Sequence, residues 1–419
     1  MTYQDRLDRQ LRIPRWNQGI LARARLGVVG DEGYLTSLFL LAAAALGINH
    51  LRVLAPALDE RFISLARDLN PEWHLHRFQG YCTHPFCYEV FSQCHLVVDL
   101  SRYSLAHKIL LEQAFQGNLP VLRALSWQTE VEQGFKIFTY RKGREWLELQ
   151  EILSPHNLPV MVGSPDGVLD IIAAGIILEE TKNILLEGRS SPELICYRTP
   201  RSALPEKQPA IAVVGAGALG NFVGLGLALA GFRDITFIDP DLIDVTNLNR
   251  QVFFGRAVGA SKSETLAAQL NRLFQTRAAA RREFFQEGTD CAGFEVIFDC
   301  VDNFASRIVL SETCASLGKI LISGGTDVAG GQVVTYRPGD NRPPPAAVLG
   351  LYNIEAQRAA AQLPQDKAAC IYQPDPAVIM SNKIIAGLMV DACRKVLSGY
   401  EAPPLFYDSR TDHKISLSD

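Results

Sequence analysis

Two stretches of the chain share one order of apolar and polar positions. Residues 26–56 (LGVVGDEGYLTSLFLLAAAALGINHLRVLAP) and 211–240 (IAVVGAGALGNFVGLGLALAGFRDITFIDP) each begin with a short apolar run and a glycine-bearing turn. An alanine- and leucine-rich run follows, and a second short apolar run ends at a proline. Short apolar runs bounded by turn residues indicate buried strands, and the longer run between them indicates a helix. Each stretch therefore predicts a strand–helix–strand unit.

Three further pairs of segments recur in the same order, which indicates an internal duplication. They are 95–122 with 295–322, 135–143 with 331–339, and 173–188 with 385–399. Strands that alternate with helices predict an α/β fold for each copy, with a doubly wound sheet that is mixed but mainly parallel. The second of these pairs predicts antiparallel strands at one edge of each sheet.

The segment between the two copies, GRSSPELICYRTPRSALPEKQP, is rich in proline and serine and shows no clear periodicity. It predicts a linker over residues 188–208, which separates a first domain at 1–187 from a second at 209–419. The second copy also contains a proline-rich and then alanine- and glutamine-rich stretch that the first copy lacks. We interpret it as a crossover insertion at about 338–369.

Composition excludes several classes of protein. The chain has 419 residues, 47% of them hydrophobic and 21% charged, and a net charge of -4, which argues against a binder of nucleic acid. The N-terminus is charged and carries no signal-peptide pattern, and the apolar runs are too short to span a membrane. Nine cysteines without a regular framework indicate reduced thiols. We therefore expect a cytoplasmic protein.

The two copies differ at the positions that carry chemistry. The second copy has Gly215, Gly217 and Gly220 in its first turn, whereas the first copy has GDEGYL. Asp239 in the second copy corresponds to Ala55, and Asp302 corresponds to Arg102. We therefore predict that the second half is active and that the first half is a degenerate partner.

The glycines of the second copy follow the pattern of a nucleotide-binding turn. Gly215 permits a tight turn, Gly217 lets backbone N–H groups approach a phosphate, and Gly220 lets the helix pack closely against the strand. Asp239 stands at the end of the next strand, where an acid accepts hydrogen bonds from ribose hydroxyls. By themselves these residues fit a site for NAD as well as a site for ATP.

Two cations beyond Asp239 favour a triphosphate. Arg250 lies within NLNRQ (247–251), and Lys262 follows twelve residues later. Displacement of pyrophosphate develops negative charge that such cations stabilise. Asp302, in DCVDN, is a carboxylate suited to Mg²⁺, which prefers hard oxygen ligands. The alternative is an ordinary salt bridge between Arg250 and Asp302, with Lys262 as a solvated surface residue.

These motifs together resemble the adenylation domain of the ubiquitin-activating (ThiF/MoeB-like) adenylating enzymes. The quoted glycine turn, DPDLIDVTNLNRQ, Lys262 and DCVDN occur in that family's order across the second half. The resemblance implies two tandem ThiF-type folds that use ATP and Mg²⁺. Asp239 would bind the ribose and Asp302 the metal. The implied phosphate ligands are Asn247, Arg250 and Lys262, with Gln251 in support.

The N-terminal segment LDRQLRI (7–13) resembles a segment that precedes the first strand in the same family. In dimeric relatives its arginine reaches the partner's ATP, which assigns that role to Arg9. A surface arginine on an amphipathic first helix is the alternative. A degenerate half beside an active half resembles the eukaryotic-type activating enzymes, so the resemblance implies a pseudo-dimer within one chain.

Most cysteines predict packing rather than chemistry. The chain contains no CxxC pair, so we expect no structural zinc of the kind found in bacterial sulfur-carrier adenylyltransferases. Cys300 and Cys393 lie in apolar segments and predict buried residues. A cluster between residues 82 and 95 matches no metal site that the spacing defines, and core packing competes with a metal there. Its members are Cys82, His84, Cys87, Cys94 and His95.

Cys370 closes the insertion and has no counterpart in the first copy. Asp375 and Pro376 follow as an N-cap and first-turn pair, and a thiol near a helix N-terminus has a lowered pKa. The stretch ACIYQPDP also resembles the cysteine segment of the compact activating enzyme for the ubiquitin-fold modifier. Cys370 is therefore a candidate acyl acceptor, and a structural cysteine is the alternative.

Three functions remain open from the sequence. The first is activation of a ubiquitin-like protein by adenylation, with a thioester on Cys370 and transfer to a conjugating enzyme, for example in a bacterial antiviral pathway. No ubiquitin-fold domain is expected after the second copy, so the two halves would recruit these partners. The second function is a sulfur-carrier or peptide adenylyltransferase without a thioester. The third is a non-catalytic nucleotide-binding partner or an NAD-linked oxidoreductase.

Overall fold

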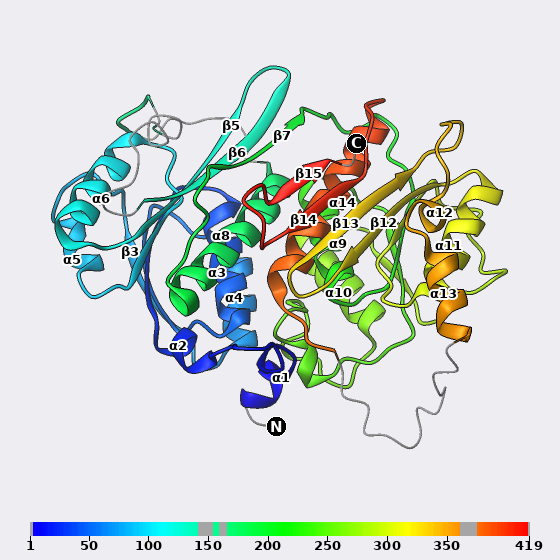
Figure 1. Ribbon diagram of the computed structural model, residues 1–419, viewed down its shortest axis with the longest axis horizontal. Helices are drawn as coiled ribbons and strands as arrows, with labels where there is room; N and C mark the ends of the chain where they lie inside the picture. The colour runs from blue at the N-terminus through cyan, green and yellow to red at the C-terminus, as the bar shows by residue number, and fades with distance from the viewer. Residues whose placement is uncertain (1–2, 141–152, 154, 159–165, 361–374, 418–419) are drawn as a thin grey trace.

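Two β-sheets, one from each half of the sequence, lie on either side of a central group of helices (Figure 1). The computed structural model describes residues 3–140, 153, 155–158, 166–360 and 375–417. Each sheet is mixed and mainly parallel, so the predicted α/β fold class is confirmed. No helix in these described ranges has the length and apolar character needed to cross a membrane.

The first sheet has seven strands in the order β3-β2-β1-β4-β5-β6-β7. The strands from β3 to β5 pair in parallel, and β6 and β7 add antiparallel pairs. The bounds are β1 Arg25–Val29, β2 His50–Ala55, β3 His74–Gln79, β4 Leu96–Asp99, β5 Val121–Gln128, β6 Glu132–Tyr140 and β7 Ile195–Pro200.

The second sheet has eight strands in the order β10-β9-β8-β11-β12-β13-β14-β15. Its first five strands are parallel and its last three pair antiparallel, so the order repeats that of the first sheet. The predicted antiparallel strands are β6 and β13, but β7 and the β14–β15 pair lie beyond them. The bounds are β8 Ile211–Val214, β9 Ile235–Ile238, β10 Ala279–Arg281, β11 Val296–Asp299, β12 Ile320–Thr326, β13 Gly330–Tyr336, β14 Leu405–Asp408 and β15 Ile415–Leu417.

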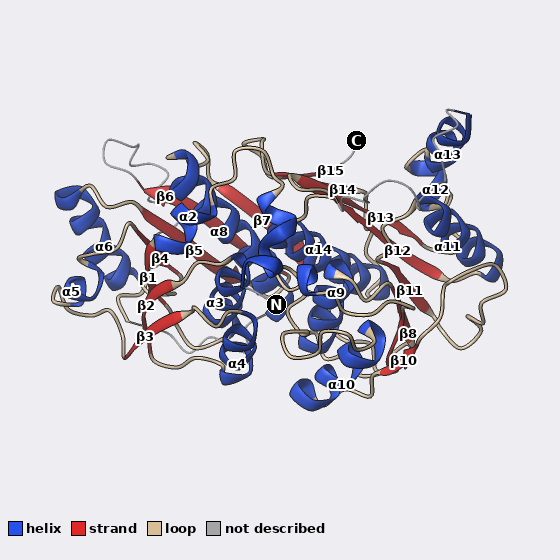
Figure 2. Cartoon of the chain, turned by 90° about the horizontal axis from the view of Figure 1, so that it is seen from below, coloured by secondary structure: helices blue, strands red, loops and turns tan. Residues whose placement is uncertain are grey.

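Helices α3, α8, α9 and α14 form the layer between the sheets (Figure 2). They are apolar on most faces because a helix between two layers is buried on every side. The bounds of the first-half helices are η1 Tyr3–Leu7, α1 Asp8–Leu11, α2 Gln18–Arg23, α3 Tyr34–Leu46, α4 Glu60–Leu69, α5 Cys87–Phe91, α6 Ser104–Gly117 and α8 Gly167–Glu187. Those of the second half are α9 Ala218–Leu229, η2 Val245–Asn247, α10 Lys262–Phe274, α11 Phe304–Leu317, α12 Pro345–Val348, α13 Leu351–Ala360 and α14 Ile379–Leu397.

Helices α8 and α14 cross through a reciprocal pair of glycine contacts. A Cβ added to Gly175 would lie 2.5 Å from Cγ1 of Ile384, and one added to Gly387 would lie 2.4 Å from Cγ1 of Ile172. The same shift in sequence relates Gly175 to Gly387 and Ile172 to Ile384. Each half therefore offers the same glycine and the same isoleucine to the other, which is the pattern of a two-fold interface.

The predicted linker contains β7, which pairs with β6 at the edge of the first sheet. Ile195, Tyr197 and Thr199 are buried in alternation with exposed neighbours. The sequence contains this period of two, but the surrounding prolines and serines make the segment look like a linker. Residues 188–208 are therefore not an unstructured connection throughout.

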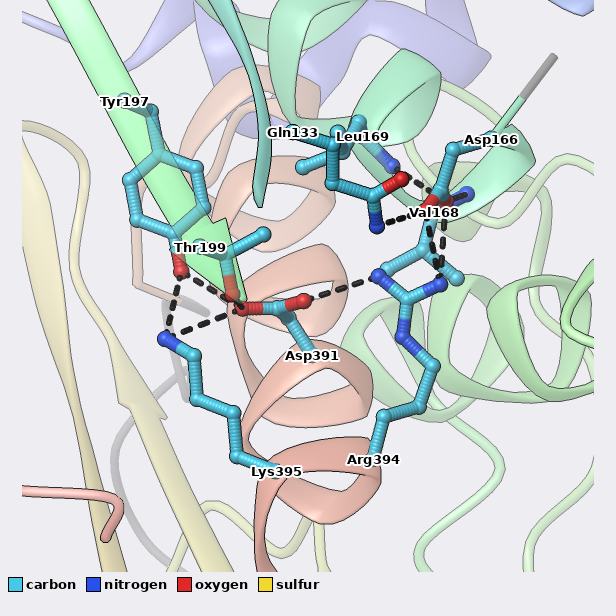
Figure 3. A network of polar contacts seen from close by, with 9 residues as sticks. All are labelled: Gln133, Asp166, Val168, Leu169, Tyr197, Thr199, Asp391, Arg394 and Lys395. Carbon is cyan, nitrogen blue, oxygen red and sulfur yellow. Dashed lines mark hydrogen bonds and ion pairs between the residues drawn. The ribbon is translucent and has the colours of Figure 1, made fainter. Parts of the chain in front are cut away.

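A polar network joins β7 and the start of α8 to helix α14 (Figure 3). The Asp391 carboxylate accepts hydrogen bonds from the hydroxyls of Tyr197 and Thr199, each at 2.8 Å. Arg394 donates to Asp391 at 2.8 Å and also pairs with Asp166 at 2.9 Å. Lys395 lies 3.1 Å from the same Asp391 carboxylate. The buried charges are therefore paired across the two halves, as low dielectric surroundings require.

Candidate functional site

The turn after β8 has the geometry that the three glycines predict. Gly215 adopts a φ of 97°, and a Cβ there would lie 2.6 Å from the carbonyl oxygen of Cys300. A Cβ at Gly220 would lie only 1.9 Å from the carbonyl oxygen of Gly215. Gly217 is the N-cap of α9 and has no side-chain cap. The N-terminal amides of α9 therefore lack a side-chain cap and can bind an anion.

Asp239 lies beside this turn, at the carboxyl end of β9. Its Oδ2 accepts a hydrogen bond from the Ala216 amide at 2.6 Å, and its Oδ1 accepts one from the Asp241 amide at 2.8 Å. Burial raises the pKa of Asp239, and the charge of Lys262 opposes that shift. A carboxylate has about four lone-pair sites, so each oxygen can still accept a bond from a ribose hydroxyl.

The NLNRQ segment begins within η2 and positions Arg250. The Asp244 and Asn247 side chains form a capping box, in which Oδ1 of Asn247 accepts from the Asp244 amide at 3.0 Å. The carbonyl of Asn247 accepts from the amides of Arg250 and Gln251. Asn247 therefore shapes the turn that carries Arg250, which the sequence did not predict.

Arg250 is a buried cation with donors to spare. Its Nη1 donates to the carbonyl of Thr246 and to Oδ1 of Asn249, both at 2.8 Å. These two bonds leave most of the five guanidinium N–H groups for a ligand. Burial, followed by the nearby charge of Arg9, lowers the pKa of Arg250 to about 10, and Asp302 opposes this shift. Arg250 stays cationic at neutral pH, in surroundings that favour an anion.

Lys262 is the first residue of α10 and faces the same region. Its Nζ lies 2.7 Å from Oδ2 of Asp241, and the side chain is only 12% exposed, against 58% for Asp241. The alternative of a solvated surface lysine is therefore wrong. An incoming phosphate can replace Asp241 as its partner at small cost, because ion pairs near solvent contribute little.

The N-terminal segment brings Arg9 to the second half. Nη1 of Arg9 donates to the carbonyl of Asp375 at 2.9 Å, and the Ala377 amide donates to the carbonyl of Arg9 at 3.3 Å. Gln10 accepts a hydrogen bond from Asn249 at 3.2 Å. Figure 1 shows α1 below the junction of the two halves. Arg9 therefore acts electrostatically on Arg250 and on the η2 turn, although they are far apart in sequence.

Asp302 is exposed in the loop between β11 and α11. It influences Arg250 electrostatically, but the two form no ion pair in the part of the chain that the structure describes. The alternative of a plain salt bridge between them is therefore not observed. An exposed carboxylate beside a buried arginine remains available to a metal.

Two further observations fit a bound nucleotide. The buried Oε1 of Gln251 has no hydrogen-bond partner in the described part of the chain. A Cβ at Gly217 would meet only Nε2 of Gln251, at 3.8 Å, so the turn has room on that side. A buried acceptor without a partner is costly unless a ligand or water supplies a donor.

Cys370 lies outside the described residues, and its predicted helix begins later than expected. Helix α14 starts at Ile379 with Val378 as its N-cap, so Asp375 is not an N-cap. The bonds to Arg9 hold residues 375–377, and Asn249 donates to the carbonyl of Ala377 at 3.1 Å. The argument that a helix N-terminus lowers the pKa of Cys370 therefore loses its support.

Most of the other described cysteines are buried, whereas Cys196 is exposed and Cys87 is partly buried. Cys300 and Cys393 are buried, as predicted, and burial raises the pKa of Cys393 to about 12. Cys94 is buried too, and burial raises its pKa to about 11. Nδ1 of His95 accepts a hydrogen bond from the Arg25 amide at 3.0 Å. Within the described ranges no group of three or more His, Cys, Asp or Glu side chains could hold a metal.

Sequence reasoning missed the residues that hold this site together. Asn221 on α9 donates to the carbonyls of Ala216 and Gly217 and accepts from the Phe253 amide. It thereby ties the glycine turn to the segment that follows Arg250. The only sequence signal was an amide inside an apolar helix, where an uncompensated polar group would be costly.

Comparison with known proteins matches residues 206–415 to the ThiF family. Among curated proteins, the chain is similar to the adenylyltransferase and sulfurtransferase MOCS3 of Drosophila grimshawi, with 34% identity over 142 residues, covering 33% of this chain and 32% of that protein. It is also similar to the probable molybdopterin-synthase adenylyltransferase of Porphyra purpurea, with 33% identity over 141 residues, 31% of this chain and 35% of that protein. The chain thus spans about a third of the length of the curated relatives it matches.

Among solved structures, the chain is similar to E. coli MccB crystallised with ATP. The TM-score is 0.42 at 20% sequence identity, covering 51% of this chain and 64% of MccB. The family match covers half of the chain and contains every described site residue except Arg9. This chain belongs to the ThiF family.

Proposed function

We propose that this chain uses Mg·ATP to adenylate the C-terminal carboxylate of a ubiquitin-like protein in the cytoplasm. Cys370 then accepts the acyl group as a thioester and passes it to a conjugating enzyme. The observation that carries the adenylation step is the convergence of an uncapped glycine turn, a buried acid and three cations at one end of the second sheet. The family match supports the same step.

The residues present fit ATP. Asp239 accepts the ribose hydroxyls with its remaining lone pairs, and the N-terminal amides of α9 face the phosphates. Lys262 would exchange Asp241 for a phosphate oxygen, and Arg250 and Arg9 would supply further positive charge. Asp302 would hold Mg²⁺, which would neutralise phosphate charge.

The charges are arranged for loss of pyrophosphate. A carboxylate oxygen of the protein substrate attacks the α-phosphorus, and the bond from that phosphorus to the bridging oxygen of pyrophosphate breaks. Negative charge then accumulates on the leaving group, where buried cations stabilise it more strongly than solvated ones would. In the second step the Cys370 thiolate attacks the acyl carbon, and AMP leaves.

One chain supplies the parts of a dimer in this proposal. The reciprocal contact between α8 and α14 matches a two-fold interface, and the N-terminal segment delivers Arg9 to the second half. The first half has Ala55 and Arg102 where the second has Asp239 and Asp302. We therefore expect one ATP site per chain, in a pseudo-dimer with domains at 1–187 and 209–419.

A sulfur-carrier or peptide adenylyltransferase that stops at the adenylate is the second candidate. The names of the two curated relatives favour it, since both are adenylyltransferases. It uses the same ATP site and needs no Cys370. An NAD-linked oxidoreductase would need none of the phosphate cations, and a non-catalytic nucleotide-binding partner would bind ATP without exchanging pyrophosphate.

The test separates the two chemical steps. Exchange of labelled pyrophosphate into ATP, in the presence of the protein substrate, reports adenylation. Asp302→Ala should reduce it at least 100-fold by removing the metal ligand, and Asp412→Ala, which removes an exposed acid in the C-terminal loop, should leave it unchanged. Unchanged exchange in Asp302→Ala refutes the metal site.

Cys370→Ala addresses the thioester. Exchange should continue in that variant, while the reductant-sensitive adduct of wild type with its substrate should disappear. An adduct that survives Cys370→Ala assigns the acceptor to another cysteine. A wild type that exchanges pyrophosphate but never forms an adduct is instead the second candidate.

A further inference from the structure

The first half contains a cavity where the second half has its glycine turn. The cavity has a volume of about 370 Å³ and lies between the turn after β1, the loop after β4, the end of β5 and the start of α8. These are the carboxyl ends of parallel strands, where open α/β sheets bind ligands. Nothing in the family match concerns this cavity, because residues 206–415 exclude it.

The lining of the cavity disfavours the binding of phosphate. Oδ2 of Asp31 accepts hydrogen bonds from the backbone amide of Arg102 at 2.6 Å and from its Nε at 3.2 Å. Glu32 and Asp170 add further carboxyl groups to the lining. An anion would meet this acidic wall, and the one lining arginine is already engaged by Asp31.

Two buried carboxyl oxygens in this lining have no hydrogen-bond partner among the residues that the structure describes. Oδ1 of Asp31 and Oδ2 of Asp170 are both unsatisfied, although the two residues are only 5% and 4% exposed. Within the described ranges, the hydroxyl of Ser126 at the end of β5 also has no hydrogen-bond partner. Buried carboxylate oxygens without donors are rare in native proteins, so the ionised forms of these two side chains, on different elements around one cavity, indicate a ligand that donates.

The remaining walls suit an apolar body. Tyr34, Leu35, Leu125 and Trp127 line the same cavity. Trp127 packs over Gly134, where a Cβ would lie 2.9 Å from the indole, so the ring is held in place. Aromatic faces attract cations as well as apolar groups. We propose that this cavity binds a small organic cation, an ammonium or guanidinium group on an apolar body.

The charges around Asp170 give the binding a pH dependence. Burial raises the pKa of Asp170 to about 8; Asp166 raises it further, whereas Arg102, Lys383 and the Leu35 amide lower it. Burial also lowers the pKa of Lys383, on α14, to about 7. A bound cation favours ionised Asp170 and neutral Lys383, so binding releases protons near neutral pH. Affinity should therefore rise from pH 6 to pH 9. Glu32 and His156 also line the cavity.

Isothermal titration calorimetry with benzamidine tests the proposal, because its neutral isostere benzamide has the same shape. Wild type should bind benzamidine at least ten times more tightly than benzamide at pH 8. Equal affinities, or preferred binding of benzoate, overturn the proposal. Agmatine and a blocked Gly-Arg-Gly peptide then distinguish a free cation from a protein side chain, by which of them binds more tightly.

Variants locate the binding within the cavity. Asp170→Asn and Asp31→Asn keep the side-chain volume and should each weaken benzamidine at least tenfold, and Asp170→Asn should reduce proton release. Asn already occurs at the matching position of α14, as Asn382. Unchanged affinity in both variants overturns the proposal. Asp302→Ala should bind benzamidine normally, so a failure of the proposed adenylation function leaves this test intact.

Discussion

The turn after β1 and the turn after β8 begin alike and end differently. The amide of Gly30 donates to the Leu54 carbonyl, and the amide of Gly215 donates to the Ile238 carbonyl, each at 2.9 Å. The first turn then takes four residues, 30–33, to reach its helix, whereas the second takes three, 215–217. The turn after β1 is therefore one residue longer than the turn after β8.

One side chain explains the extra residue. Counted from the start of each helix, Thr36 on α3 occupies the position of Gly220 on α9. The contact of 1.9 Å between a Cβ at Gly220 and the Gly215 carbonyl shows that α9 could not hold a threonine there. The longer turn makes room for Thr36, and Asp31 then takes the space beside the strand ends. The proposed anion site and the acid-lined cavity thus differ in the length of this turn, among other positions.

Each half has a buried aspartate at the end of its fourth parallel strand position, β4 or β11, but the residues that pair with it differ between the halves. Asp99 pairs with Arg123 on β5 at 2.7 Å and with His107 on α6 at 3.3 Å. At the matching positions, Asp299 accepts from Ser323 on β12 at 2.6 Å and pairs with Arg307 on α11 at 3.2 Å. The arginine that pairs with the acid is thus on a strand in the first half and on a helix in the second, and each acid has one arginine partner. The halves therefore differ at their sites, but in both cores the buried carboxylate is paired with a cation, because an unpaired buried charge is costly.

Replacing Asp239 by the alanine of the first half should have the largest effect on pyrophosphate exchange. Asp239→Ala introduces the alanine that the first half has at the matching position, Ala55. It removes the proposed acceptor for the ribose and the acceptor for two loop amides. We expect pyrophosphate exchange to fall at least 100-fold. In calorimetry with a nonhydrolysable ATP analogue, wild type should bind one equivalent and the variant none that is detectable.

The control for this experiment is Asp239→Asn, which keeps one acceptor oxygen and should retain part of the binding. Circular dichroism of both variants checks that they fold. Two equal sites in wild type, or full exchange in Asp239→Ala, would remove the distinction between an active and a degenerate half.

The second largest effect concerns the exchanged arginine. Arg307→Ala leaves Asp299 buried without its cation and should lower the free energy of unfolding by about 3–5 kcal/mol. The double variant Arg307→His with Ser323→Arg copies the arrangement around Asp99 and should recover at least half of that loss. Urea unfolding of the single and double variants measures both. If the double variant is no more stable than Arg307→Ala, the two arrangements are not interchangeable.

Much of this comparison could be predicted from the sequence, because the duplicated patterns are local. The glycine turn, the position of Asp239 and the order of strands and helices follow from apolar periodicity and turn residues. The polar partners of Asp99 and Asp299 could not be predicted in this way. They meet through strand pairing, in which Asp99 lies opposite Arg123 and Asp299 opposite Ser323, and pairing is set by the whole sheet.

Long-range contacts account for the predictions that failed. Asp375 looks like an N-cap next to Pro376, but Arg9 binds its carbonyl and the helix begins at Ile379. Strand β7 was hidden in a proline-rich segment because its burial depends on β6 and on Asp391 of α14. Local propensity was overridden in both places by a partner distant in sequence.

A smaller and paired effect tests the two-fold contact of α8 and α14. Gly175→Ala forces a methyl against Ile384, and Gly387→Ala forces one against Ile172. Overpacking of this kind costs about 1–3 kcal/mol. Because the contacts are reciprocal, the two variants should lose similar stability in thermal unfolding. In an Ile384→Ala background, which lacks Cγ1, Gly175→Ala should cost less than it does in wild type, whereas the cost of Gly387→Ala should not change. A large loss in one variant and none in the other would show that the helices do not share the contact equally.

The smallest effect concerns the residue that opens the helix after each buried acid. Asn303 caps α11, and its Oδ1 accepts from the Ser306 amide at 2.8 Å. The matching residue of α6, Tyr103, makes no cap and is instead fully buried, with its hydroxyl accepting from the Cys82 amide at 2.8 Å. One half thus uses this position for a helix terminus and the other for its core.

Asn303→Ala removes the cap while touching little else, because the side chain is exposed. The free energy of unfolding should fall by about 1 kcal/mol, and Asn303→Ser should restore most of it because serine caps nearly as well. Tyr103→Ala should cost more, about 3–5 kcal/mol, because it empties a buried site. Urea unfolding without nucleotide keeps the neighbouring Asp302 from contributing through ligand binding. If Asn303→Ala is as costly as Tyr103→Ala, the side chain of Asn303 contributes more than a cap, and the two halves are more alike at this position than their contacts indicate.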